Sequence, residues 1–181
     1  TIIQSANGVR ANIEQGNFDS TSSGNVATSR QLAGSNGSFS DINQNGDGNS
    51  LTNDGNTASV TQSGANSDSF AYTGDRNGNS NTVNVTQSGA NSVSRVFVDG
   101  FDAIPTDGNS VTVDQNGANT HSFVQQAGSN NIADVQLDGA GDGSNVGRTD
   151  FNGYYGDPAE SVVVQIGDNQ KAYVAQIANS A

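Results

Sequence analysis

Few residues of this chain have side chains suited to covalent or acid–base chemistry. There is one histidine, His121, and no cysteine, so a hydrolytic nucleophile would need His121 as its base, for example at Ser122. His121 falls at an outward or arc position of the pattern described below, where a solvated histidine is the ordinary outcome. A glycoside-cleaving pair of carboxylates would need an acidic cluster on one strand face, and none repeats along the sequence. We therefore expect no enzyme.

Aspartates between glycines are the second kind of candidate, in this case for metal binding. The runs QNGDGNS (44–50) and DGAGDGSN (138–145) resemble the calcium-binding nonapeptide of β-roll adhesins, and oxygen ligands in a tight loop suit Ca²⁺. The ligands would then be Asp138 and Asp142. Neither run repeats in tandem, and Asp-Gly is also a common turn. A calcium-binding β-roll adhesin module is the alternative function. The main interpretation includes no metal or other cofactor.

The composition excludes several classes of protein. Asn, Ser, Gly and Gln supply 84 of the 181 residues and only 31% are hydrophobic, a balance that by itself indicates disorder. No run approaches the roughly 20 apolar residues of a membrane helix, so we expect no membrane insertion. A net charge of −12 argues against nucleic acid as a partner. The first residue is Thr1, as expected of a secreted chain whose signal peptide has been removed.

A repeat makes an ordered fold the better interpretation. The segment VTQSGANS occurs at 60–67 and again at 85–92, and VDQNGANT follows at 113–120. Every second residue before each of these glutamines is Asn, Ala or Val, which gives the unit N-x-A/V-x-V-x-Q-x-G. This alternation of inward and outward residues is typical of β-strands. The Gly, Asn, Asp and Ser clusters between units indicate turns. No segment keeps the apolar period of a helix.

The inward positions of this unit carry no charge, whereas Glu14, Arg95 and Asp134 fall on outward positions. Stacked amide side chains can donate to one rung and accept from another, which satisfies buried polar groups. We expect the stacked interior to contain Asn25, Ala27, Gln31, Asn56, Ala58, Val60, Gln62, Asn81, Val83, Val85, Gln87, Asn109, Val111, Val113, Gln115, Gln126, Asn131, Ala133, Val163, Gln165, Ala172, Val174 and Gln176.

Short and long connections alternate along the chain, which predicts a β-solenoid with strand–arc–strand rungs. We expect a single domain, 1–181, with about seven rungs and two stacked parallel sheets. Like strands should recur every 22 to 28 residues. The expected sides are Val60, Val85, Val113, Val135 and Val163 on one, and Ala71, Val96, Val124, Thr149 and Val174 on the other. The register between Gln31 and Gln62 stays open, because Gln44 to Gln62 is short for a full rung.

An ice-binding protein would need a flat, regular threonine face. Thr61, Thr86 and Thr112 form the nearest approach, a ladder of three that is more typical of an ordinary strand surface.

The repeat resembles that of the curlin family, the secreted subunits of bacterial functional amyloid fibres, which reads Q-x-G-x-x-N-x-A-x-x-x-Q. Gln126, Gly128, Asn131 and Ala133 match it, with Leu137 in the place of the last Gln. The match at 165–176 has its Asn one residue early, and the match at 4–15 is looser. Many units carry Asn four residues after Gln rather than five, and several arcs are longer than the family's compact turns.

The resemblance implies a structural subunit of an extracellular, cell-surface fibre for adhesion and biofilm matrix. It also implies a nucleator subunit and an outer-membrane secretion pore as further partners. The main partner would be the chain itself, assembled head-to-tail. We expect the segment from Ile2 to Ala6 to dock against residues 171–177 of another copy, with Ile3, Gln4, Val174 and Gln176 at the junction.

Overall fold

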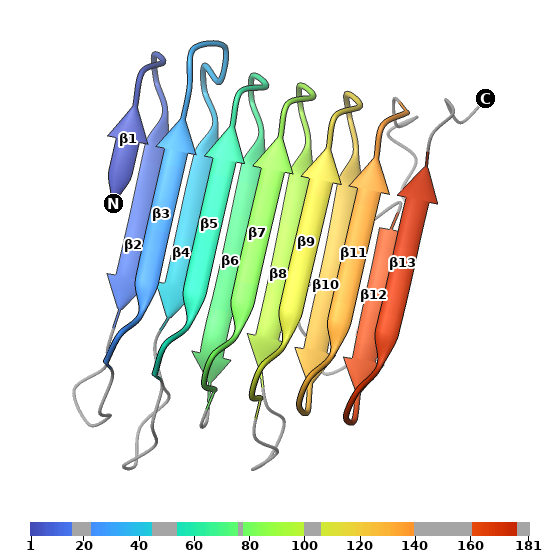
Figure 1. Cartoon of the computed structure of the whole chain (residues 1–181). Helices are drawn as coiled ribbons and strands as arrows, with labels where there is room; N and C mark the ends of the chain where they lie inside the picture. Colours follow the sequence, from blue (N-terminus) through green and yellow to red (C-terminus); the bar gives the residue numbers. More distant parts are fainter. Residues whose placement is uncertain (16–22, 45–53, 76–77, 100–105, 140–160, 177–181) are drawn as a thin grey trace.

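The fold is an all-β solenoid (Figure 1). The computed structural model describes residues 1–15, 23–44, 54–75, 78–99, 106–139 and 161–176, and these ranges contain strands and turns but no helix. The strands are β1 (Ile2–Gln4), β2 (Arg10–Gln15), β3 (Val26–Gln31), β4 (Phe39–Gln44), β5 (Thr57–Gln62), β6 (Asp68–Asp75), β7 (Thr82–Gln87), β8 (Val93–Asp99), β9 (Ser110–Gln115), β10 (His121–Ala127), β11 (Ile132–Leu137), β12 (Ser161–Ile166) and β13 (Lys171–Gln176).

The odd-numbered strands form a seven-stranded sheet, β1-β3-β5-β7-β9-β11-β13, and the even-numbered strands form a six-stranded sheet, β2-β4-β6-β8-β10-β12. Figure 1 shows the two sheets face to face, and consecutive strands of the chain lie in opposite sheets. All neighbouring strands are parallel. The described strands make six complete pairs and one further strand, slightly fewer than the seven full rungs expected.

The expected grouping of strands is wrong at its C-terminal end. Val60, Val85, Val113 and Val135 do share one sheet, but Val174 continues this row, because β13 pairs with β11. Val163 lies beside Val124 in the other sheet, since β12 pairs directly with β10. The sequence pattern assigned a strand near Thr149, which lies outside the described residues. Counting that extra strand shifted both later strands to the opposite sheet.

In the described residues between Gln31 and Gln62 the strands alternate between the two sheets in the regular order. β3 and β5 are neighbours, with Gln31 beside Gln62, and β4 lies between them along the chain but in the facing sheet. Gln44 therefore stacks on Gln15 rather than on Gln62. The threonine ladder is also different from the expected one, because Thr61 lies beside Thr86 but Thr112 lies beside Asn84 in the adjacent row.

Small and β-branched side chains fill the space between the sheets. Val60, Val83, Val96, Val113 and Val135 are among the fully buried residues of one continuous cluster that extends along the coil. Parallel strands in register repeat every 4.8 Å or so, so each of these side chains packs on its counterpart in the next rung. Apolar contact thus runs along the coil axis as well as between the sheets.

The glycine of the Gln-x-Gly motif is required by the close approach of successive arcs. A Cβ on Gly64 would lie 2.0 Å from the Gly89 carbonyl oxygen, and one on Gly89 would lie 1.9 Å from that of Gly117. No real Cβ tolerates such contacts with backbone atoms. The asparagines two residues later, Asn66 and Asn91, have φ of 53° and 57°, a left-handed conformation that asparagine adopts more readily than most residues.

Replacement of Gly89 by alanine tests this packing. Gly89→Ala should lower the free energy of unfolding by at least about 2 kcal/mol, because the new methyl group overlaps backbone that cannot rotate away. Urea unfolding followed by circular dichroism measures the change. Ala90→Ser alters the half-buried neighbour and should cost less than about 0.5 kcal/mol. Equal stability of Gly89→Ala and the wild type would contradict the close approach.

Candidate functional site: stacked amides and open ends

A row of glutamines runs through the interior of the seven-stranded sheet. Each Nε2 donates to the Oε1 of the next glutamine toward the C-terminal end. The four distances are 2.8 Å from Gln4 to Gln31, 3.0 Å from Gln31 to Gln62, 2.9 Å from Gln62 to Gln87 and 2.9 Å from Gln87 to Gln115. All the bonds have the same direction, so the row is polar along the coil axis.

The same side-chain amides also donate hydrogen bonds to backbone carbonyl oxygens of the facing sheet. Gln87 Nε2 lies 2.9 Å from the Asp68 carbonyl oxygen and 3.2 Å from that of Ser92, at the starts of two facing strands. Gln31, Gln62 and Gln115 make the equivalent pairs of contacts. Because each glutamine bridges two successive facing strands, the two sheets are offset by half a strand spacing along the axis.

Asparagines stack where the chain enters the seven-stranded sheet. The Asn25 side-chain oxygen accepts the backbone N–H of Asn56 at 2.8 Å, and the bond repeats from Asn56 to Asn81, Asn109 and Asn131 at 2.9–3.0 Å. From Asn56 onward the Nδ2 donates to an arc carbonyl oxygen of the next rung, for example from Asn109 to Gly128 at 2.7 Å. The side-chain oxygens thus accept the backbone N–H of the residue just before each strand, where the ladder of backbone bonds has not yet begun.

The structure places most of the predicted stacking positions in the interior. Asn25, Ala172 and Val174, near the ends of the coil, are half-buried, and Gln176 lies beside Leu137 in register. The buried members are Ala27, Gln31, Asn56, Ala58, Val60, Gln62, Asn81, Val83, Val85, Gln87, Asn109, Val111, Val113, Gln115, Gln126, Asn131, Ala133, Val163 and Gln165.

A second row of short polar side chains was missed in the sequence. Ser38, Ser67, Ser92 and Thr120 precede strands of the six-stranded sheet and are buried. Ser38 Oγ accepts the Ser67 N–H at 2.9 Å, and Ser67 Oγ donates to the Gly89 carbonyl oxygen at 3.0 Å. Serine here does what asparagine does on the other side. The available signal was the alternation S-x-S-x-I-x-Q at 38–44, which also contains the missed Gln44.

The glutamine rows are interrupted at particular rungs. Leu137 follows Gln115 in one sheet, and Val98 precedes Gln126 in the other. Gln126 donates to Gln165 at 2.7 Å, but its own Oε1 is buried without a hydrogen-bond partner, because Val98 offers no donor. The orphaned oxygen shows what is lost where valine stands in the place of the preceding glutamine.

Both ends of the described coil have an open strand edge in each sheet. β1 and β2 at one end, and β13 and β12 at the other, each pair with one described strand only. Five of the six exposed large apolar residues in the described ranges belong to these strands: Ile2, Ile3, Val164, Ile166 and Tyr173. Ile2 and Gln4 stack on inward residues, whereas Ile3 lies beside Arg30 on the outer face. Of the expected junction residues, Ile3 therefore contributes to the outer surface.

The residues considered for chemistry lie apart from one another. His121 is an outward residue of β10 beside Val93, whereas Ser122 is buried and its Oγ lies 3.3 Å from that of Ser94, so the two side chains face opposite sides of the strand. Asp138 Oδ1 accepts from Asn116 and its Oδ2 from Gln136. Asp142 lies outside the described residues. Within the described ranges no three His, Cys, Asp or Glu side chains are grouped as a metal site.

One group of aspartates does lie on a single outer face, although it does not repeat along the coil. Asp114 on β9 faces Asp134 and Asp138 from the next rung. Burial raises the pKa of Asp114, the charges of Asp138 and Asp134 raise it further, and Asn116 opposes the shift in part. One Asp114 oxygen is buried without a hydrogen-bond partner. The cluster thus carries unfavourable charge at neutral pH.

Comparison with known proteins identifies no relative: no protein-family model, curated protein or solved structure matches the chain. No helix in the described ranges has the length and apolar character needed to cross a membrane.

Substitution of Gln87 measures what the amide row contributes. Gln87→Leu should cost about 2–3 kcal/mol of unfolding free energy, since it leaves buried partners of the amide unpaired. Gln87→Glu should cost more at pH 7, because a carboxylate would face carbonyl oxygens, and less at pH 4. Urea unfolding at both pH values gives the comparison. Thr86→Val, on the exposed side of the same strand, is the control. An unaffected Gln87→Leu variant would show that the row is energetically neutral.

Removal of the Asp114 charge should stabilise the fold at neutral pH. A carboxyl whose pKa is raised by folding favours the folded state below its ordinary value of 3.8, and this contribution is lost as pH rises through the raised pKa. Asp114→Asn should therefore be more stable than the wild type at pH 7, by less than about 1 kcal/mol because the group is partly solvated, and equally stable near pH 3. Thermal unfolding across this range measures the difference, with Thr112→Asn as the control. A difference that does not change with pH would exclude the electrostatic cause.

Proposed function

We propose that this protein is a structural subunit that assembles head-to-tail into an extracellular amyloid-type fibre. The observation that carries the proposal is the matching pair of open edges in the seven-stranded sheet. β1 and β13 belong to the same sheet, run parallel, and each places a glutamine at the same register position, Gln4 and Gln176. Repetition of that contact does not close, so it builds a filament.

The registers of β1 and β13 within their sheet give the residue pairs of the proposed junction. Stacking β1 of one copy on β13 of another places Ile2 beside Val174 and Gln4 beside Gln176. Ile2, which is 47% exposed, would be covered by this contact. Half-buried Ala172 and Val174 already pack on the core on one side only, and the next copy would supply the other side.

The polarity of the glutamine row favours head-to-tail contact over the alternatives. Gln4 donates to Gln31, so its Oε1 is left to accept at the N-terminal end of the coil. A glutamine from the C-terminal end of another copy donates in this direction. Two N-terminal ends placed together would set acceptor against acceptor, and their strands could not continue a parallel sheet.

The offset of the two sheets by half a strand spacing determines which sheet would form the junction. With seven strands in one sheet and six in the other, a β13–β1 junction leaves room for one strand in the six-stranded sheet between β12 and the next copy's β2. The junction is therefore made by the seven-stranded sheet, which allows the two edges to be tested separately.

Adhesion and a role in biofilm matrix come from the resemblance to curlin fibres, as do the nucleator subunit, the outer-membrane secretion pore and the extracellular location. The physical argument for assembly is independent of them. The net charge of −12 gives separate copies a mutual repulsion that keeps them soluble before they dock.

A proline on the β13 edge should stop fibre growth without unfolding the subunit. N–H groups alternate between neighbours in a parallel strand, and those of Ser110 and Ile132 point to the following rung. By register, the N–H of Ala175 points to the open edge. Ala175→Pro removes a donor needed only by the next copy, a position where strands tolerate proline. Electron microscopy and fibre diffraction should show filaments with a reflection near 4.8 Å for the wild type and none for this variant.

Val164→Pro is the matched control on the open edge of β12, which the proposed junction does not use, and it should leave growth close to the wild-type rate. Ala175→Ser controls for the side chain. Val174→Pro removes an N–H that faces β11 and should both loosen the last strand and stop growth. Filaments of Ala175→Pro growing at the wild-type rate would overturn the proposed junction, and the absence of wild-type filaments would overturn the function.

A further inference from the structure

The outer face of the six-stranded sheet carries an aromatic patch that the fold does not require. Phe39, Phe70, Tyr72 and Phe97 occupy outward positions of β4, β6 and β8 and are half-buried. Their ring centroids are 5.5 Å apart for Phe39 and Phe70 and 6.2 Å for Tyr72 and Phe97. Outward residues of a solenoid are free to be polar, so half-exposed rings gathered on one face indicate a binding surface.

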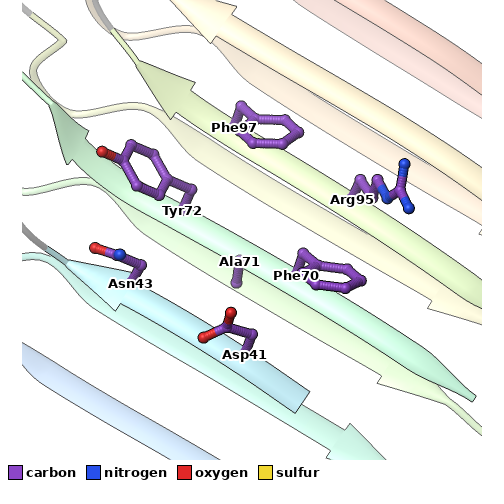
Figure 2. Close-up of a pocket in the computed structure, with 7 residues that line it drawn as sticks. All are labelled: Asp41, Asn43, Phe70, Ala71, Tyr72, Arg95 and Phe97. Carbon is purple, nitrogen blue, oxygen red and sulfur yellow. The ribbon is translucent and has the colours of Figure 1, made fainter. Parts of the chain in front are cut away.

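Figure 2 shows three of these rings, Phe70, Tyr72 and Phe97, lining a hollow. Phe70 and Tyr72 lie along β6, Phe97 lies beside them on β8, and Asp41 and Asn43 flank them from β4. The hollow has a volume of about 420 Å³, within the range of small-ligand sites. Three neighbouring strands span roughly 10 Å, about the length of a disaccharide.

Polar groups are placed among the rings. The Arg95 guanidinium carbon lies 5.3 Å from the centre of the Phe70 ring, and Asp41 accepts a hydrogen bond from Asn12 at 3.0 Å. The lining therefore combines flat apolar surfaces with a carboxylate, an amide, a guanidinium and the Tyr72 hydroxyl.

We propose that this hollow binds a neutral sugar chain, with pyranose rings against the aromatic side chains and hydroxyls bonded to Asp41, Asn43 and Arg95. A sugar offers a C–H face to the rings and, around its edge, hydroxyls that both donate to a carboxylate and accept from a guanidinium. An apolar peptide or a lipid chain would cover the Asp41 carboxylate without offering it a hydrogen-bond donor, which is costly. The acidic charge of the chain disfavours nucleic acid and acidic polysaccharides. The site is complete in one copy, so the proposal stands whether or not copies stack.

The test uses the full chain at neutral pH with cellohexaose and maltohexaose, a β-linked and an α-linked neutral glucan fragment, as probes. Saturation-transfer NMR and titration calorimetry should detect saturable binding of at least one. Tyr72→Ala and Phe97→Ala should each weaken that binding by at least about tenfold. Tyr72→Phe keeps the ring and should stay within about threefold. Tyr173→Ala, which removes an exposed ring from the other sheet, should bind as the wild type does.

Circular dichroism shows whether each variant is folded. If an alanine variant loses its β-sheet signal, Asn43→Ala and Arg95→Gln replace it, since both keep the rings, and each should weaken binding by about fivefold. Failure of the wild type to bind either glucan overturns the proposal, as does binding that none of these variants weakens. Concentration-dependent dimerisation in sedimentation, abolished by Phe97→Ala and unchanged by the glucans, would assign the face to a second copy instead.

Discussion

The structure depends on one constraint: every buried backbone carbonyl that the arcs leave unpaired must find a donor within its own rung or the next. Glutamine meets this constraint because its Nε2 reaches across the interior. Gln62, for example, donates to the carbonyl oxygens of Phe39 and Ser67 at 2.7 Å and to Gln87 at 2.9 Å. A chain with 31% hydrophobic residues folds because amides replace part of the apolar core, at positions where an apolar side chain would leave carbonyl groups unsatisfied.

The same constraint makes the coil polar and repetitive. Where glutamines are adjacent, each amide donates toward the C-terminal end, so these rungs present acceptors to the preceding rung and donors to the following one. The rows break at Leu137 and Val98, and the rungs at the ends of the described coil have a neighbour on one side only. The exposed Ile2 and Tyr173 are found at those ends. The end-to-end contact proposed between copies would therefore continue the interaction that folds each copy.

The interior of the fold was largely predictable from the sequence, because it consists of repeated residue types at a spacing of two. The Gln-x-Gly frame located the rows that contain Asn81, Val85 and Gln87. The frame failed where a different residue does the same work. Ser67 takes the place of asparagine, so the rows of the six-stranded sheet were only partly recognised, and the register between Gln31 and Gln62, which includes β4, stayed open. Sheet assignment failed after residue 139, because pairing depends on the number of intervening strands and the long segment before β12 gives no reliable count.

The contacts between outward side chains could not be predicted, since the repeat fixes that these residues point outward but not their type. Their chemistry arises from stacking all the same. Strands in register bring outward residues of neighbouring rungs together whatever they are, so Phe97 meets Phe123 at 5.7 Å while Asp114 meets the charges of Asp134 and Asp138. The first contact is favourable and forms a patch, and the second is unfavourable and raises a pKa. The two lie on opposite sheets. In the proposed filament both features would repeat along the length, as one stripe of aromatic hollows and one stripe of carboxylates, while the interior of each copy stays as it is.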